Sequence, residues 1–153
     1  MGLEEDIAIL EAVPALAMLG RQALRILAIG AESRQIPQGG VLFYAGDLAD
    51  GGYIVQDGAF VLEPESLKQT EEITVGPGAL IGELGLLTAT VRTTTATAAE
   101  PSTVIRIPRS LFLKMLEGYP AAAKKMRDVM ADRVESWQRD LIAVKDKLDP
   151  DSR

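Results

Sequence analysis

The sequence has 153 residues, of which 47% are hydrophobic and 25% are charged, a composition typical of one globular domain. Its 16 basic and 22 acidic residues give a net charge of −6, and it contains no histidine and no cysteine. These absences exclude disulfides, thiol nucleophiles, zinc sites built from Cys or His, and imidazole as a general base.

The distribution of charge and apolar residues indicates a cytoplasmic protein that contacts neither membrane nor nucleic acid. The chain begins with an acidic segment, unlike a signal peptide, and has no apolar run of about 18 residues, the length that a membrane span needs. Residues 1–100 contain 14 acids and 5 bases, so most of the chain would repel a phosphate backbone.

The first thirty residues have helical spacing. Apolar residues recur at intervals of three and four, namely Leu16, Leu19, Ala23, Leu24, Leu27 and Ala28. Pro14 is suited to the start of a helix, and Gly30 to its end.

From about residue 33 to residue 107 the pattern changes to short β-rich runs separated by Gly, Pro and Asp. The candidate strands are 33–36, 41–44, 53–57, 59–63, 71–75, 94–99 and 103–107. Asp57-Gly58 predicts a hairpin turn between two of them, because both positions tolerate positive φ. Many short strands at this spacing are typical of a sandwich or a jelly-roll barrel.

After Pro108 the helical period returns, with a short helix closed by Gly118 and a longer one that begins at Pro120. The longer helix has an apolar seam with steps of four and three, formed by Met130, Val134, Trp137, Leu141, Val144 and Leu148. This seam predicts either a coiled-coil homodimer or packing on the chain's own barrel. The whole order predicts an α+β fold: an antiparallel β-roll (a jelly-roll-like barrel) flanked by N-terminal and C-terminal helices.

Residues 76–95 contain the candidate chemistry. Arg92 is the one basic residue between Lys68 and Arg106, so its guanidinium suits a single compact anion rather than a polymer. The segment 79–84 has the pattern of a helical turn entered through glycines, whose unpaired N–H groups can face an anion, and it contains Glu83. The alternative is a tight turn with Glu83 in solvent and Arg92 paired to a carboxylate.

The spacing of Gly82-Glu83-Leu84-x-Leu86-Leu87 and Arg92-Thr93 resembles the phosphate-binding cassette of the cyclic nucleotide-binding domain family. Further matches fall at the family's barrel glycines: residues 36–42, Gly46-Asp47-x-Ala49-Asp50, Tyr53-Ile54-Val55-x-x-Gly58 and Gly78. Gly51-Gly52 departs from the bulkier residue usual before the Tyr. The resemblance divides the chain into a helical segment 1–32, a β-roll 33–107 with the cassette at 78–95, and C-terminal lid or dimerisation helices 108–149.

The resemblance also implies roles for individual residues. Gly82, Glu83 and Leu84 would offer backbone N–H groups to the cyclic phosphate, and Glu83 would also bind the ribose 2′-hydroxyl. Arg92 would neutralise the phosphodiester, and Thr93 would bind the phosphate or the base. On the C-terminal helix, Arg133 and Trp137 would lie near the base.

The sequence therefore predicts a sensor that binds cAMP or cGMP, has no enzymatic activity and needs no metal or cofactor. It would signal to an unknown downstream protein by moving its C-terminal helices. Three alternatives remain open: a degenerate β-roll scaffold that binds no nucleotide, the sensory half of a DNA-binding regulator, and a cupin-like metal enzyme, for which the usual histidines are missing.

Overall fold

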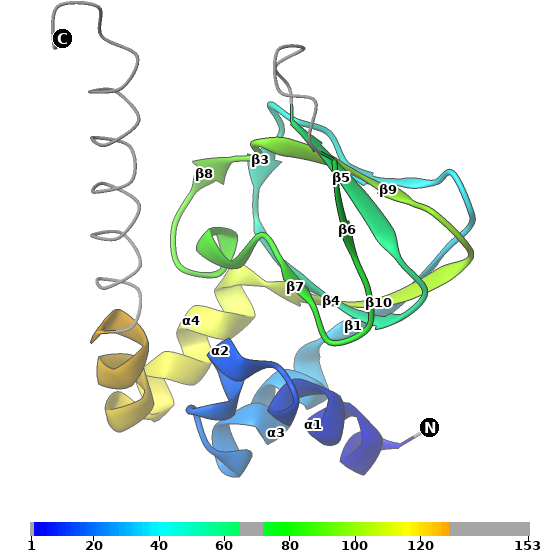
Figure 1. Cartoon of the computed structure of the whole chain (residues 1–153). Coiled ribbons are helices and arrows are strands. Elements are labelled where there is room, and N and C mark those ends of the chain that lie inside the picture. Colours follow the sequence, from blue (N-terminus) through cyan, green and yellow to red (C-terminus); the bar gives the residue numbers. More distant parts are fainter. Residues whose placement is uncertain (1, 65–71, 129–153) are drawn as a thin grey trace, which may run out of the picture.

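The computed structural model describes residues 2–64 and 72–128, and Figure 1 shows their arrangement. A helical layer packs beneath an antiparallel β-roll, which confirms the predicted α+β class. No helix in these two ranges is long and apolar enough to cross a membrane.

The N-terminal segment forms three helices, which are α1 (Leu3–Glu11), α2 (Pro14–Ala17) and α3 (Arg21–Gly30). Pro14 and Gly30 begin and end helices as predicted. The first thirty residues are helical as predicted, although the apolar residues that carried the prediction begin at Leu16 and none of them lies in α1. The helical spacing between residues 16 and 28 is divided at Gly20, which adopts a φ of 91° outside the range of a right-handed helix.

The roll consists of two main sheets and a short ribbon. The first sheet has the order β1-β10-β4-β7, the second β2-β9-β5-β6, and β3 pairs with β8. The strands are β1 (Glu32–Ile36), β2 (Val41–Phe43), β3 (Leu48–Ala49), β4 (Gly51–Asp57), β5 (Phe60–Pro64), β6 (Ile73–Val75), β7 (Leu80–Ile81), β8 (Thr90–Val91), β9 (Thr94–Ala98) and β10 (Ser102–Pro108). All seven candidate strands are present, with ends shifted by at most three residues; the two-residue strands β3, β7 and β8 were not predicted.

The predicted hairpin at Asp57-Gly58 is wrong. The chain does turn there, at a φ of 90° for Gly58. However, β4 pairs with β10 and β7, whereas β5 pairs with β6 and β9. The turn therefore carries the chain from one sheet to the other, because the local signal specifies a reversal but not which strands pair.

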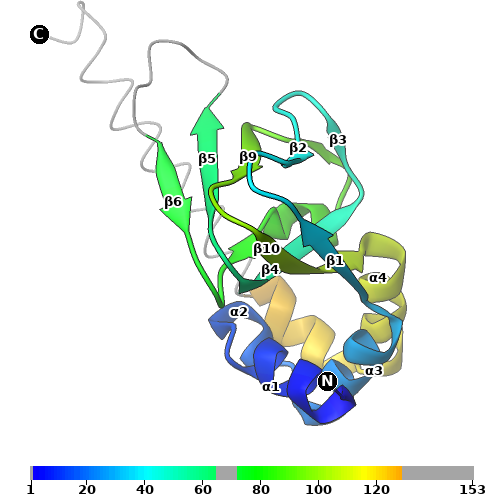
Figure 2. The same cartoon turned by 90° about the vertical axis from the view of Figure 1, so that its right-hand side faces the viewer.

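The alternation of side chains along β4 gives the molecule two apolar cores. Ile54 packs with the helices, while its neighbours Tyr53 and Val55 point into the interior of the roll. The interior core also contains Phe43 and Phe60. Strand β4 thus separates a helical core from the roll, and Figure 2 shows the helices on one side of its sheet.

The chain leaves the roll through α4 (Arg109–Gly118) and is helical again over 120–128. The closure at Gly118 and the start at Pro120 agree with the prediction. Phe112 and Met115 of α4 are buried in the helical core. The apolar seam from Met130 to Leu148 lies outside the described residues.

Candidate functional site

The entrance to the site is formed by strand β7 and the 3-10 helix η1 (Glu83–Leu86). Between them Gly82 adopts a φ of 75°, a left-handed conformation that glycine reaches without steric strain. The predicted helical turn over 79–84 therefore starts later, since Leu80 and Ile81 extend along β4. The first N–H groups of a helix have no partner within the helix itself, so the sharp turn at Gly82 leads directly into main-chain donors that point out of η1.

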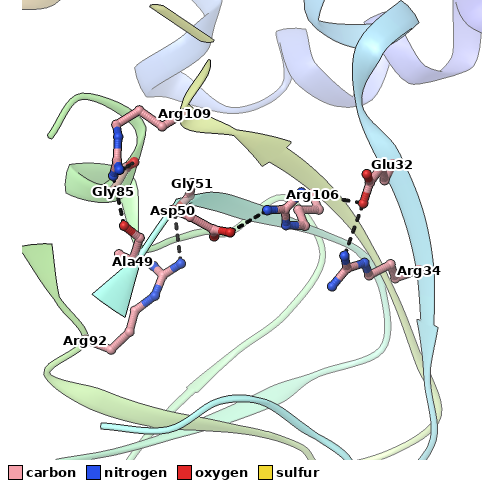
Figure 3. A network of polar contacts seen from close by, with 9 residues as sticks. All are labelled: Glu32, Arg34, Ala49, Asp50, Gly51, Gly85, Arg92, Arg106 and Arg109. Atoms are coloured by element: carbon pink, nitrogen blue, oxygen red, sulfur yellow. Dashed lines mark hydrogen bonds and ion pairs between the residues drawn. The ribbon is translucent and has the colours of Figure 1, made fainter. Parts of the chain in front are cut away.

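Arg92 lies between β8 and β9, and its side chain is only 6% exposed. Its main chain is fixed by bonds from Arg92 N to Asp47 O (2.7 Å) and from Gly46 N to Arg92 O (2.8 Å). Its Nη2 donates to the carbonyl oxygen of Gly51 at 3.0 Å, as Figure 3 shows. The guanidinium carbon lies 4.3 Å from the ring centroid of Phe43, a cation–π distance.

Among the described residues, the charge of Arg92 is buried without a carboxylate partner. None of the ion pairs between described residues includes Arg92. Burial lowers the pKa of Arg92, and the electrostatic interactions with Tyr53 and Asp50 act against that shift. Because arginine stays protonated in proteins, a positive charge remains inside the roll. The alternative prediction, in which Arg92 is paired with a carboxylate, is therefore wrong for the residues that the structure describes.

Gly82 and Arg92 are in direct contact. A Cβ atom placed on Gly82 would overlap Nη1 of Arg92. The structure thus brings together two predicted site residues that are ten positions apart in the sequence, and the contact requires glycine at position 82.

A cavity of about 440 Å³ lies beside this contact. That volume is in the range of small-molecule sites. Its walls come from β7, η1, β8 and the residues around Arg92, and the lining consists of Phe43, Leu62, Leu80, Ile81, Gly82, Glu83, Leu84, Gly85, Thr90, Val91, Arg92, Thr93 and Thr94. Five of the seven predicted site residues therefore line one cavity: Gly82, Glu83, Leu84, Arg92 and Thr93. The other two, Arg133 and Trp137, lie outside the described residues.

The composition of the lining indicates what the cavity can hold. One guanidinium and several threonine hydroxyls lie among aliphatic side chains, so the cavity suits a ligand with one compact anionic group and an apolar or aromatic remainder. In the described ranges no cluster of acidic side chains could hold a metal ion, so the cupin-like alternative gains no support there.

Sequence reasoning missed the polar contacts of Arg109, and Figure 3 shows those with Ala49 and Gly85. Nη1 of Arg109, the first residue of α4, lies close to three carbonyl oxygens, those of Ala49 (2.8 Å), Thr88 (3.1 Å) and Gly85 (3.3 Å). These bonds tie the start of α4 to η1 and the loop that follows. The sequence does show an arginine directly after the last strand. Its partners are main-chain oxygens, however, and every residue has one, so the sequence does not indicate which residues Arg109 contacts.

A helix-flanked antiparallel roll with a buried arginine in its cavity wall defines a ligand-binding β-roll domain. The sequence also matches the cyclic nucleotide-binding domain over residues 33–119. This match covers more than half of the chain, so the chain belongs to the cyclic nucleotide-binding domain family.

Individual relatives agree with this assignment. The chain is 30% identical over 112 residues to the cyclic AMP receptor protein of Thermus thermophilus, covering 72% of this chain and 52% of that protein. A solved structure of a cyclic nucleotide-binding-like protein from Brucella abortus has a TM-score of 0.66 at 40% identity, covering 74% of this chain and 98% of that one.

Another relative is the lysophospholipase NTE1 of Candida albicans, which is 37% identical over 109 residues. The match covers 67% of this chain but 8% of that protein. This chain thus spans a small fraction of one curated relative and about half of the other.

Proposed function

We propose that this chain is a cyclic nucleotide sensor module that binds cAMP or cGMP in the cavity beside Arg92. The observation that carries the proposal is a buried guanidinium with no carboxylate partner among the described residues, in contact with the turn at Gly82 and in the wall of a cavity of about 440 Å³. A buried charge of this kind is unfavourable unless an anion compensates it.

The cavity lining supports a role for the five predicted residues that it contains. Nη2 of Arg92 gives one of its two hydrogens to Gly51 and Nη1 lies against the turn at Gly82, so we assign Nη1 to the phosphate. The backbone N–H groups of Gly82, Glu83 and Leu84 would bind the same phosphate. The Glu83 carboxylate would accept a hydrogen bond from the ribose, and Thr93 would donate its hydroxyl to the phosphate or the base.

The choice between cAMP and cGMP stays open in this proposal. The printed name of the Thermus relative refers to cyclic AMP. Thr93 beside the arginine is a feature that often accompanies cGMP in the family. Both nucleotides carry the same cyclic phosphodiester, which is the group that Arg92 would recognise.

The proposed output is a change in the position of the C-terminal helices, with no catalysis and no metal or cofactor. A ligand that contacts both η1 and the lid helix favours the arrangement in which the two sets of contacts coexist. Homodimerisation through the C-terminal helix, a cytoplasmic location and an unidentified downstream protein belong to the same proposal. The competing reading is a β-roll scaffold that binds no nucleotide.

Isothermal titration calorimetry with cAMP and cGMP tests the proposal. Wild type should bind at least one of the two, and Arg92→Ala should weaken binding about 30- to 1000-fold, because the substitution leaves a buried phosphate charge without its partner. Arg34→Ala is a matched control, since Arg34 is an exposed arginine of β1 away from the cavity lining. No heat from either nucleotide with the wild-type protein would support the scaffold instead.

A further inference from the structure

Asp50 is the carboxylate next in sequence to the main-chain oxygen that Arg92 contacts. Asp50 directly precedes Gly51, whose carbonyl oxygen accepts the bond from Arg92 Nη2 at 3.0 Å. Its negative charge acts on Arg92 and opposes the lowering of that residue's pKa by burial. A carboxylate paired with Arg92 would occupy the donors that an anionic ligand needs.

The Asp50 carboxylate is instead bound by a second arginine. Oδ2 of Asp50 lies 2.7 Å from Nη2 of Arg106, and Figure 3 shows Asp50 between the two arginines with its carboxylate directed toward Arg106. The side chain of Arg106 is 14% exposed, whereas that of Asp50 is 66% exposed. The arginine is therefore the fixed partner, and the carboxylate is the one free to move.

Arg106 is itself held in place by β1. Its Nη1 lies 3.5 Å from the Glu32 carboxylate, which also pairs with Arg34 at 3.1 Å. Burial lowers the pKa of Arg106, but the hydrogen bond and the charge of Asp50 outweigh it, so the net pKa is raised. The charges of the two acids and two arginines in this group, Glu32, Asp50, Arg34 and Arg106, sum to zero. The positive charge of Arg92 therefore remains available to a ligand with one negative charge.

The remaining carboxylate whose charge acts on Arg92 is that of Asp47. Its Oδ2 accepts a hydrogen bond from the backbone N–H of Tyr44 at 2.9 Å. Asp47 is thus held by its own turn, and Asp50 is the acid whose position depends on Arg106.

We propose that Arg106 is a positioning residue that holds the Asp50 carboxylate away from Arg92 and so keeps Arg92 available for an anionic ligand. This inference rests on the proposed function for the identity of the anion, a cyclic phosphodiester. It assigns to Arg106 an effect on binding although Arg106 does not line the cavity.

The ion pair can be broken from either end, and the two results differ. Arg106→Met keeps an aliphatic stem of similar length but releases Asp50, so the affinity for cyclic nucleotide should fall about tenfold if Asp50 then occupies Arg92 about nine-tenths of the time. Asp50→Asn breaks the same pair without leaving a competing charge, so it should bind as well as wild type or better. The double variant should recover wild-type affinity to within about twofold.

Calorimetry of these three variants tests the inference, with Arg34→Ala as the control that disturbs Glu32 but not Asp50. Equal losses in Arg106→Met and Asp50→Asn, or no recovery in the double variant, would mean that the pair is merely structural and would overturn the inference.

A crystal structure of the nucleotide-free Arg106→Met variant gives a readout that does not depend on ligand. It should contain an Asp50–Arg92 ion pair within about 4 Å. If wild type binds neither nucleotide, the proposed function fails, yet this structure still decides the role of Arg106. An Asp50 carboxylate that stays in solvent there contradicts the inference.

Discussion

Gly82 and Arg92 define the site at the scale of single residues. The φ of 75° at Gly82 and its contact with Arg92 Nη1 are two separate reasons for glycine at this position. One is the conformation of the backbone, and the other is the space that the guanidinium occupies. A suitable pair of variants separates the two effects.

Gly82→Ala should weaken nucleotide binding by about tenfold or more, because the added Cβ displaces the guanidinium from the donors beside it. It should also lower the free energy of unfolding by about 1–3 kcal/mol, since alanine is strained at positive φ. Calorimetry and urea denaturation measure the two effects.

Gly78→Ala is the control, because Gly78 also has a positive φ of 90° but a Cβ there meets no atom within 4 Å. It should lose stability with little change in affinity. If the two variants lost affinity equally, the contact between Gly82 and Arg92 would not matter for binding.

At the scale of secondary-structure elements, Arg109 connects η1 to α4. Its backbone N–H donates to Asp50 O at 2.7 Å, and its Nη1 contacts carbonyl oxygens of β3, of η1 and of the loop after η1. Helix α4 in turn packs against α3. Because Arg109 is the first residue of α4 and is bonded to η1, a shift of η1 on ligand binding would be transmitted to α4 through this residue.

Arg109→Ala should lower the free energy of unfolding by about 1–3 kcal/mol, since three main-chain oxygens lose a charged donor. It should also weaken nucleotide binding, because η1 loses its anchor to α4. Urea denaturation and calorimetry test this, with Lys114→Ala on the exposed side of α4 as the control. An Arg109→Ala protein as stable as that control would contradict the role given to Arg109.

The sequence predicted elements whose signal is local and missed those whose signal is not. Pro14, Gly30 and Gly118 mark helix ends through their own backbone preferences, so those ends could be predicted. The two-residue strands could not, because so short a run has no period. The turn at Gly58 was predicted, but its strands belong to different sheets, and sheet membership depends on contacts far apart in the sequence.

The same distinction holds for the site. Residues 82–84 and 92–93 follow a spacing that a sequence can display, and the structure lines one cavity with them. Arg106 and Asp50 are 56 positions apart, and their pairing depends on how β4 and β10 align. The resemblance singled out Asp50 within a glycine motif without giving it a partner.

For the whole molecule, a ligand held in the cavity of the roll should stabilise the complete fold. At a free nucleotide concentration of 100 times Kd, binding adds about 2.7 kcal/mol to the free energy of unfolding. For a chain of this size that corresponds to a rise in Tm of about 5–10 °C. Differential scanning calorimetry should find this rise in the wild-type protein and a rise of at most about 3 °C in Arg92→Ala at the same nucleotide concentration, because its affinity is at least about 30-fold lower.

The most direct test of the central claim is a crystal structure of the wild-type chain with saturating cAMP or cGMP. We expect the cyclic phosphate within hydrogen-bonding distance of Arg92 Nη1 and of the backbone N–H groups of residues 82–84. A nucleotide bound elsewhere, or a cavity that stays empty at saturation, would contradict the account.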